Sequence, residues 1–252
     1  MRAADDIHGW LVDLDGTLLS GGQAMPGAGA FLESCGGRFV VVSNDAEHTP
    51  AELSAALGGV GLDVSAQRIV LAGTAALDGI ALRRPGARVL VAASRGLAAH
   101  ARMRGLVPVR ERPEVVFLGR DRQFTHRRLM AAANAVRAGA ELVVANPDLV
   151  HPGAGGTIVP ETGALLAALL ACTGPVPYRL IGKPEPELFA IGLALLDLPR
   201  RAVAMLGDNP ATDGEGARRF GLRYIAMTDG VFPRIAEQGA CHEPKAMVAS
   251  PA

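Results

Sequence analysis

Two aspartates stand one residue apart in the stretch "LVDLDGTLLS", residues 11–20. Asp13 and Asp15 follow an apolar run, so a pair of carboxylates ends what we expect to be a buried strand. Ionised carboxylates repel each other and resist the loss of water. In such a place a carboxylate can act as a nucleophile or as a ligand of a hard cation. Taken alone, the stretch fits a solvated turn equally well, because Asp-Gly favours turns.

Three more apolar runs end in polar residues, in the stretches "VVVSND", "RLIGKPEPELF" and "AVAMLGDNPATD". The residues that follow these runs are Ser43, Asn44, Asp45, Lys183, Asp208 and Asp213. In isolation, Lys183 reads as a surface lysine, Ser43 as a turn residue and Asp213 as the start of a helix, which its charge favours. Carboxylates, Ser-Asn, Lys and Gly-Asp in this order, each at a strand end, are much harder to obtain by chance.

The elements that must position these residues alternate along the chain. Strands are predicted at 9–14, 38–43, 87–92, 114–119, 141–145, 178–181, 202–207 and 223–227. Helices are predicted at 27–35, 50–58, 74–84, 96–104, 125–138, 161–172, 186–196 and 211–220. This alternation indicates an α/β fold with largely parallel sheets. Ligands gather at the carboxyl ends of parallel strands, which is where the polar residues stand.

The composition narrows the class of protein and its surroundings. The chain has 252 residues, 49% of them hydrophobic, and no formal net charge, which favours one or two globular domains and argues against nucleic acid as a partner. The start lacks the layout of a signal peptide, and the longest apolar run, 163–172, is about half the ~20 residues of a membrane span. Cys35, Cys172 and Cys241 lie far apart, which predicts free thiols in a reducing cytoplasm.

Four stretches resemble the four motifs of the haloacid dehalogenase-like hydrolase superfamily: "DLDGTL", "VVSN", "GKPEPELF" and "GDNPATD". Residues 121–174 are also similar to the cap of its 4-nitrophenylphosphatase or NagD-like branch, which includes pyridoxal phosphate and phosphoglycolate phosphatases. The resemblance implies a Rossmann-like, doubly wound parallel-sheet core with an inserted α/β cap. The cap would span 86–176 and determine substrate choice, and 1–85 with 177–252 would form a discontinuous catalytic core. Association of identical copies through the cap stays open.

The resemblance further implies a Mg²⁺-dependent phosphatase that hydrolyses phosphate monoesters of small metabolites through an aspartyl-phosphate. Asp13 is expected as the nucleophile. Asp15 would protonate the leaving group and then activate water, which needs a pKa above the ordinary ~3.9 of an aspartate. Asp13, Asp208 and the backbone carbonyl of Asp15 would bind the metal, while Asp213 would hold its waters.

The phosphoryl oxygens would be held by Ser43, by the amides of Asn44 and Asp45, and by Lys183. The branch usually has Asn in place of Asp45, and commonly an acidic residue in place of Ala211. An acidic side chain beside a phosphate is repulsive, so we expect Asp45 to offer only its backbone N–H or to point away. Such departures make a substrate copied from a relative unsafe.

Substrate choice would fall to the Gly- and Pro-rich stretch 146–163, predicted as a long loop. His151, beside Pro152, is its candidate for contacting substrate, although a surface histidine is the simpler interpretation. A non-enzymatic phospho-acceptor or phosphometabolite-binding module on the same core is the alternative function. Asp15 argues against it, because a stable signalling phosphate has no use for a base that hydrolyses it.

Overall fold

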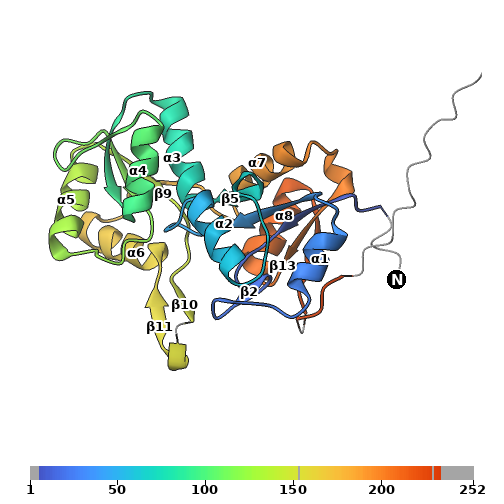
Figure 1. Cartoon of the computed structure of the whole chain (residues 1–252). Coiled ribbons are helices and arrows are strands. Elements are labelled where there is room, and N and C mark those ends of the chain that lie inside the picture. Colours follow the sequence, from blue (N-terminus) through green and yellow to red (C-terminus); the bar gives the residue numbers. More distant parts are fainter. Residues whose placement is uncertain (1–5, 153, 229, 234–252) are drawn as a thin grey trace, which may run out of the picture.

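The computed structural model describes residues 6–152, 154–228 and 230–233, so the predictions for both ends of the chain, Cys241 included, lie outside it. Two five-stranded parallel sheets stand in separate lobes (Figure 1). The first, in the order β14-β13-β1-β4-β5, consists of β1 (Gly9–Val12), β4 (Phe39–Ser43), β5 (Ile69–Leu71), β13 (Val203–Gly207) and β14 (Arg223–Ala226). The second, in the order β12-β9-β8-β6-β7, consists of β6 (Arg88–Ala92), β7 (Val107–Pro108), β8 (Val115–Leu118), β9 (Glu141–Val144) and β12 (Arg179–Leu180). The predicted α/β fold with parallel sheets is confirmed.

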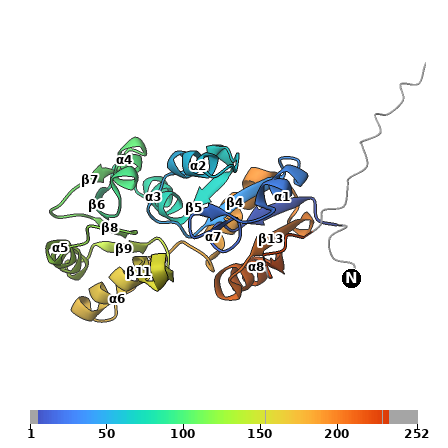
Figure 2. The ribbon, with the colours of Figure 1, turned by 60° about the horizontal axis from the view of Figure 1, so that its bottom comes forward.

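Helices cover both faces of each sheet. On the first sheet, α1 and α2 lie on one face and α7 and α8 on the other (Figure 2). On the second, α5 and α6 pack on one face and α4 on the other. Their bounds are α1 (Ala28–Ser34), α2 (Pro50–Gly59), α3 (Ala72–Arg83), α4 (Arg95–Met103), α5 (His126–Arg137), α6 (Thr162–Thr173), α7 (Pro186–Leu196) and α8 (Glu215–Phe220). The core is therefore doubly wound, as predicted.

One continuous apolar core joins the two lobes. Leu11 and Val42 of the first sheet share it with Val89 and Phe117 of the second, and Leu77 of α3 lies in the same cluster. All five side chains are fully buried. Apolar contact of this kind stabilises the two sheets against each other through the hydrophobic effect. The lobes thus meet through packed side chains as well as through the two chain crossings.

Several elements differ from the sequence prediction. Strand β5 was missed because its three apolar residues run straight into α3, with no turn signal between. The stretch 146–163 is not a long loop, since it forms an antiparallel hairpin of β10 (Val150–Pro152) and β11 (Ile158–Pro160). The predicted helix at 211–220 begins as a π-helical turn, Pro210–Gly214, and only then continues as α8.

Short elements complete the described chain. They are the hairpin strands β2 (Leu19–Ser20) and β3 (Gln23–Ala24) and the 3₁₀ turns Ala66–Arg68, Ala154–Gly156 and Arg200–Ala202. Strand β12 pairs in parallel with β9, so the chain returns to the first lobe only after Leu180. Among the described residues, no helix combines the length and the apolar character that a bilayer crossing needs.

Candidate active site

The polar strand ends of the first sheet meet at one edge. Strands β1, β4 and β13 are neighbours and run parallel, so the residues after them share the carboxyl edge of the sheet. The backbone N–H of Asp13, the residue directly after β1, donates to the carbonyl of Leu206 in β13 at 2.8 Å. This hydrogen bond continues the sheet pairing and fixes the position of Asp13 at the end of the strand. Register and hydrogen bonding thus bring Asp13, Ser43 and Asp208 to the same edge.

A buried lysine, in the segment before α7, connects this edge to the π-helical turn before α8. The Lys183 ammonium is 2% exposed and donates to Asp13 at 2.5 Å, to Asp213 at 2.7 Å and to the carbonyl of Val42 at 3.0 Å. Burial alone would lower the pKa of Lys183, but the two carboxylates outweigh it and raise the pKa. Burial raises the pKa of Asp13 and of Asp213 to about 6, against the opposing charge of Lys183. The Lys183 ammonium uses all three of its N–H donors in these contacts, so the side chain is held in one position.

Three carboxylates converge next to this lysine. One oxygen each of Asp13, Asp208 and Asp213 lies within 4.8 Å of the others. Two glycines allow the approach: a Cβ on Gly16 (φ 80°) would lie 2.0 Å from Asp208 Oδ2, and one on Gly207 would lie 2.2 Å from Asp213 Oδ2. Burial, and then the charge of Asp213, raise the pKa of Asp208. A cluster of hard oxygen donors with excess negative charge fits Mg²⁺.

Asp15 stands at the mouth of the site. The Asp15 side chain reaches the surface, but the surrounding protein removes part of its hydration. This desolvation raises the pKa of Asp15, and the charge of Asp45 raises that pKa further. Asp45 itself is occupied in its own loop, where it accepts from the backbone N–H groups of Glu47 and His48 and from His48 Nδ1 at 2.7 Å. Burial raises the pKa of Asp45, but these hydrogen bonds prevail and lower it.

Ser43 and Asn44 hold the loop after β4. Ser43 is buried, and its hydroxyl oxygen accepts from the backbone N–H of Asp45 at 3.1 Å. The Asn44 side chain accepts from the backbone N–H of Lys183 at 2.7 Å and donates to the Lys183 carbonyl and to Asp148, each at 3.1 Å. The amide of Asn44 is therefore committed to holding Lys183, and its backbone N–H is the group left for a ligand.

Sequence reasoning missed several side chains of this site, all in the second lobe. Asn146 donates to the carbonyl of Asn44 at 2.6 Å, and Asp148 accepts from the Asn44 side chain. His151, which the sequence did single out, lies on β10, and the charge of Glu161, directly after β11, adds to the raised pKa of Asp15, so the hairpin ends near the mouth. The rule of polar strand ends, applied to "VVANPD" after β9, would have found Asn146 and Asp148.

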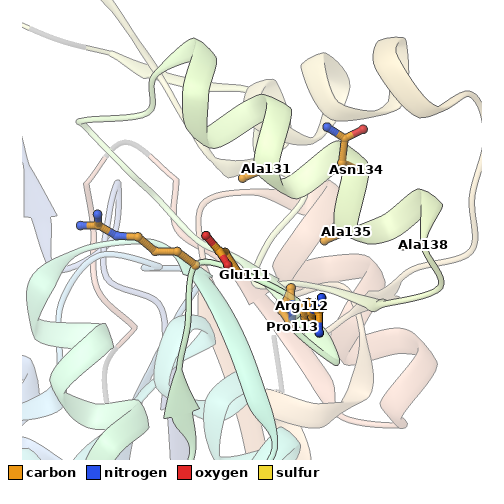
Figure 3. A pocket seen from close by; sticks show the side chains of 8 residues that line it. Glu111, Arg112, Pro113, Ala131, Asn134, Ala135 and Ala138 are labelled. Carbon is orange, nitrogen blue, oxygen red and sulfur yellow. The ribbon is translucent and has the colours of Figure 1, made fainter.

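A separate groove lies on the second lobe. It encloses about 540 Å³ between α5 and the loop at 110–113 (Figure 3). Glu111, Arg112 and Asn134 contribute polar atoms, and small alanines of α5 form much of the remaining wall. None of the clustered carboxylates lines it. The groove is therefore not part of the candidate site.

Comparison with known proteins agrees with this geometry. The family model described as haloacid dehalogenase-like hydrolase matches residues 10–107, and a second, HAD-hydrolase-like model matches 180–250. A dihydroxyacetone phosphatase of Corynebacterium glutamicum is 32% identical over 88% of this chain and 81% of that protein. The chain belongs to the haloacid dehalogenase-like hydrolases.

Solved structures define the branch. A 4-nitrophenylphosphatase from Thermotoga maritima matches with a TM-score of 0.83 and 28% identity over 88% of this chain and 86% of the other. A glycerol phosphate phosphatase from Mycobacterium tuberculosis, in complex with magnesium, matches with a TM-score of 0.82 and 34% identity. The match covers 90% of this chain and 69% of the other. The expected branch, the phosphatase class and the magnesium cofactor are confirmed, and a non-enzymatic phospho-acceptor is not favoured.

Proposed function

We propose that this phosphatase hydrolyses phosphate monoesters of small hydroxylated metabolites, with Asp13 as nucleophile and Asp15 as acid and base. The single observation that carries the assignment is the buried contact of Asp13 with Lys183. Because Lys183 offsets its charge and Asp208 and Asp213 crowd it, Asp13 is poised beside a cation-binding cluster at the strand edge. A carboxylate so placed is suited to attack an anionic phosphoryl group.

The reaction would proceed in two displacements at phosphorus. A carboxylate oxygen of Asp13 attacks phosphorus, the bond to the ester oxygen breaks, and Asp15 gives its proton to that oxygen. Asp15, now ionised, takes a proton from water, whose oxygen attacks phosphorus and breaks its bond to Asp13. The raised pKa of Asp15 supports this role, because the first displacement needs its protonated form.

Mg²⁺, when bound, supplies positive charge that offsets the repulsion between Asp13 and the phosphate. Asp13, Asp208 and the Asp15 carbonyl would hold it. Asp213 would orient its waters, since Lys183 and the backbone N–H of Asn209 already occupy Asp213. The hydroxyl of Ser43 and the backbone N–H of Asn44 would bind the phosphoryl oxygens, and the backbone N–H of Asp45 would join them on leaving the Ser43 hydroxyl. Lys183, whose three N–H donors the protein already uses, would contribute its positive charge.

The substrate class rests on the relatives and on the second lobe. We assign the second lobe as the cap expected at 86–176, extended to Leu180 because β12 belongs to its sheet, and the flanking segments as the catalytic core. The relatives are named for dihydroxyacetone and glycerol phosphate, both small hydroxylated leaving groups. His151 on the hairpin pairs with Glu161 directly after it, and a polar pair close enough to Asp15 to influence its pKa supports the same class.

Phosphate release from purified protein with Mg²⁺ tests the proposal. The panel is glycerol 3-phosphate, dihydroxyacetone phosphate, 4-nitrophenyl phosphate and a nucleoside monophosphate. We expect the two small hydroxylated esters to give the highest kcat/KM among the metabolites, and Asp13→Asn to abolish all turnover. A preference for the nucleotide would contradict the substrate class, and a fully active Asp13→Asn variant would contradict the mechanism.

Two further proposals concern the surroundings of the protein. The thiols of Cys35 and Cys172 are free, which supports a reducing, cytoplasmic compartment. Leu149, Val150 and Ile158 on the hairpin are exposed apolar side chains, which supports association of identical copies through the cap. Cell fractionation and the mass of the purified protein in solution test these two proposals.

A further inference from the structure

The segment that follows β8 rests on the loop that follows β4. The backbone N–H of Arg120 donates to the carbonyl of Ala46 at 2.9 Å, and a Cβ on Gly119 would lie 2.9 Å from that same oxygen. Ser94 donates to the carbonyl of Glu47 at 2.5 Å. The second lobe therefore contacts the first through one backbone and one side-chain hydrogen bond, both to carbonyls a few residues from Ser43.

The Arg120 side chain extends this contact to the hairpin. It is 14% exposed, and its guanidinium lies 3.1 Å from the Glu47 carboxylate and 3.3 Å from the Glu161 carboxylate. Its Nη2 also lies 3.5 Å from His151 Nε2. Arg120 is thus sandwiched between a carboxylate of the catalytic lobe and two side chains of the hairpin. Arg122 also pairs with Glu47, at 2.8 Å, but is 65% exposed.

These contacts determine the protonation of His151. Its Nδ1 lies 2.5 Å from Glu161 Oε1, and a carboxylate at that distance accepts a hydrogen bond from the ring N–H. Its Nε2 faces the guanidinium of Arg120, which has only donors. A nitrogen that faces a donor is placed to accept a hydrogen bond, so these contacts select the ring tautomer with its proton on Nδ1.

We propose that Arg120 is a positioning residue: by joining Glu47 to Glu161 and His151, it holds the hairpin at the leaving-group side of Asp15. This inference rests on the proposed function. Without Arg120, only Glu161 would orient the ring, and no ion pair would link the hairpin to the first lobe at this point. Misplacing a group by about 1 Å can cost up to about a hundredfold in rate. The loss should affect esters whose leaving group reaches the hairpin.

The test compares Arg120→Met with Arg122→Met, a matched control that removes an arginine from the same carboxylate without touching His151. We expect Arg120→Met to lower kcat/KM for glycerol 3-phosphate about threefold to a hundredfold, since one hydrogen-bonded contact is at stake. The value for 4-nitrophenyl phosphate, whose leaving group needs little help, should change less than about threefold. Arg122→Met should change neither. Equal losses on both esters, or none on either, would overturn the proposal.

A second readout does not depend on turnover. Long-range ¹H–¹⁵N spectra, with the His151 signals assigned by their loss in His151→Gln, report which ring nitrogen carries the proton. We expect the proton on Nδ1 in the wild type. In Arg120→Met no arginine donor faces Nε2, so the preference for a proton on Nδ1 should weaken. An Nε2–H or charged ring in the wild type would refute the arrangement.

The two proposals fail in different ways. Wild-type protein that hydrolyses no ester contradicts the proposed function, whereas the tautomer measurement still decides the role of Arg120. If Arg120→Met does not fold, Arg120→Lys replaces it, because Glu47, Glu161 and His151 face three different nitrogens of the guanidinium, and the one nitrogen of an ammonium cannot stand at all three positions. That variant should still show the selective loss on glycerol 3-phosphate, and unchanged selectivity would again overturn the proposal.

Discussion

Replacing Lys183 with methionine is expected to destabilise the metal-free protein strongly. The ammonium pairs with Asp13 and Asp213, both buried. Removing one partner of a buried ion pair typically costs about 3–5 kcal/mol, because the other charge stays without compensation. Here two carboxylates lose their partner, and each has a pKa of about 6 even with Lys183 present. Because the unfolded value is 3.8, loss of the cation raises the folded pKa values further above it.

The sign of the pH dependence follows from these values. A carboxyl whose pKa is raised on folding contributes stability below the unfolded pKa, and loses it as pH rises through the folded one. In Lys183→Met the carboxyls of Asp13 and Asp213 therefore take up protons in mild acid, and the loss of stability relative to the wild type is smallest there. At about pH 8 each carboxyl must either ionise while buried or stay protonated although the solution pH favours ionisation, and both cost free energy. There we expect the free energy of unfolding of Lys183→Met to lie about 3–5 kcal/mol below that of the wild type.

Urea denaturation in the presence of chelator measures this difference. Arg179→Met is the control, since Arg179 pairs with Glu187 at the surface and such pairs contribute about 0–1 kcal/mol. The double variant Lys183→Met with Asp213→Asn should recover part of the stability, because one of the unpaired charges is gone. A loss below about 1 kcal/mol for Lys183→Met at about pH 8 would refute the reasoning, since a buried pair cannot be removed so cheaply.

Three further predictions follow from the same geometry. Asp15→Asn should slow turnover by ~10²–10⁴, the usual extent of general acid–base assistance, and a milder loss in steady-state kinetics would demote it to a turn residue. Chelator should abolish activity and Mg²⁺ restore it, and Asp208→Ala should need more Mg²⁺ for half-maximal rate; equal rates with and without chelator would exclude this metal scheme. The pKa of His48 is raised, chiefly by its hydrogen bond to Asp45, whose own pKa is lowered, so their pairing stabilises most between their ordinary values of 3.8 and 6.5 and fades above. The urea midpoints of wild type and His48→Gln should accordingly differ more within that range than well above it, and a constant gap would argue against the pairing.

The fold could be predicted where sequence signals are local. Apolar runs followed by Asp13, Ser43 and Asp208 predicted β1, β4 and β13 correctly, because a clear change from apolar to polar residues marks the end of each strand. Strand β5 and the hairpin at 150–160 lack that change, so short strands were missed there. Pairing across a sheet adds stability that the sequence of one segment does not display.

The candidate site divides in the same way. Residues at the strand ends of the first sheet could be selected from their types, and the structure brings Asp13, Lys183, Asp208 and Asp213 together. Arg120, by contrast, depends on the contact between two lobes. Such a contact joins positions far apart in the chain, and no periodicity or spacing in one sequence encodes it.

The most direct test of the central claim is to detect the phosphoryl group on Asp13. Asp15→Asn retains the nucleophile but lacks the base that activates water, and the good leaving group of 4-nitrophenyl phosphate needs little protonation. Acid quenching after mixing this variant with the ester and Mg²⁺ should therefore trap the aspartyl-phosphate. Mass spectrometry is expected to find the mass of one phosphoryl group on the peptide that contains Asp13, and none in Asp13→Asn with Asp15→Asn. Release of 4-nitrophenol with the peptide unmodified throughout would contradict the account.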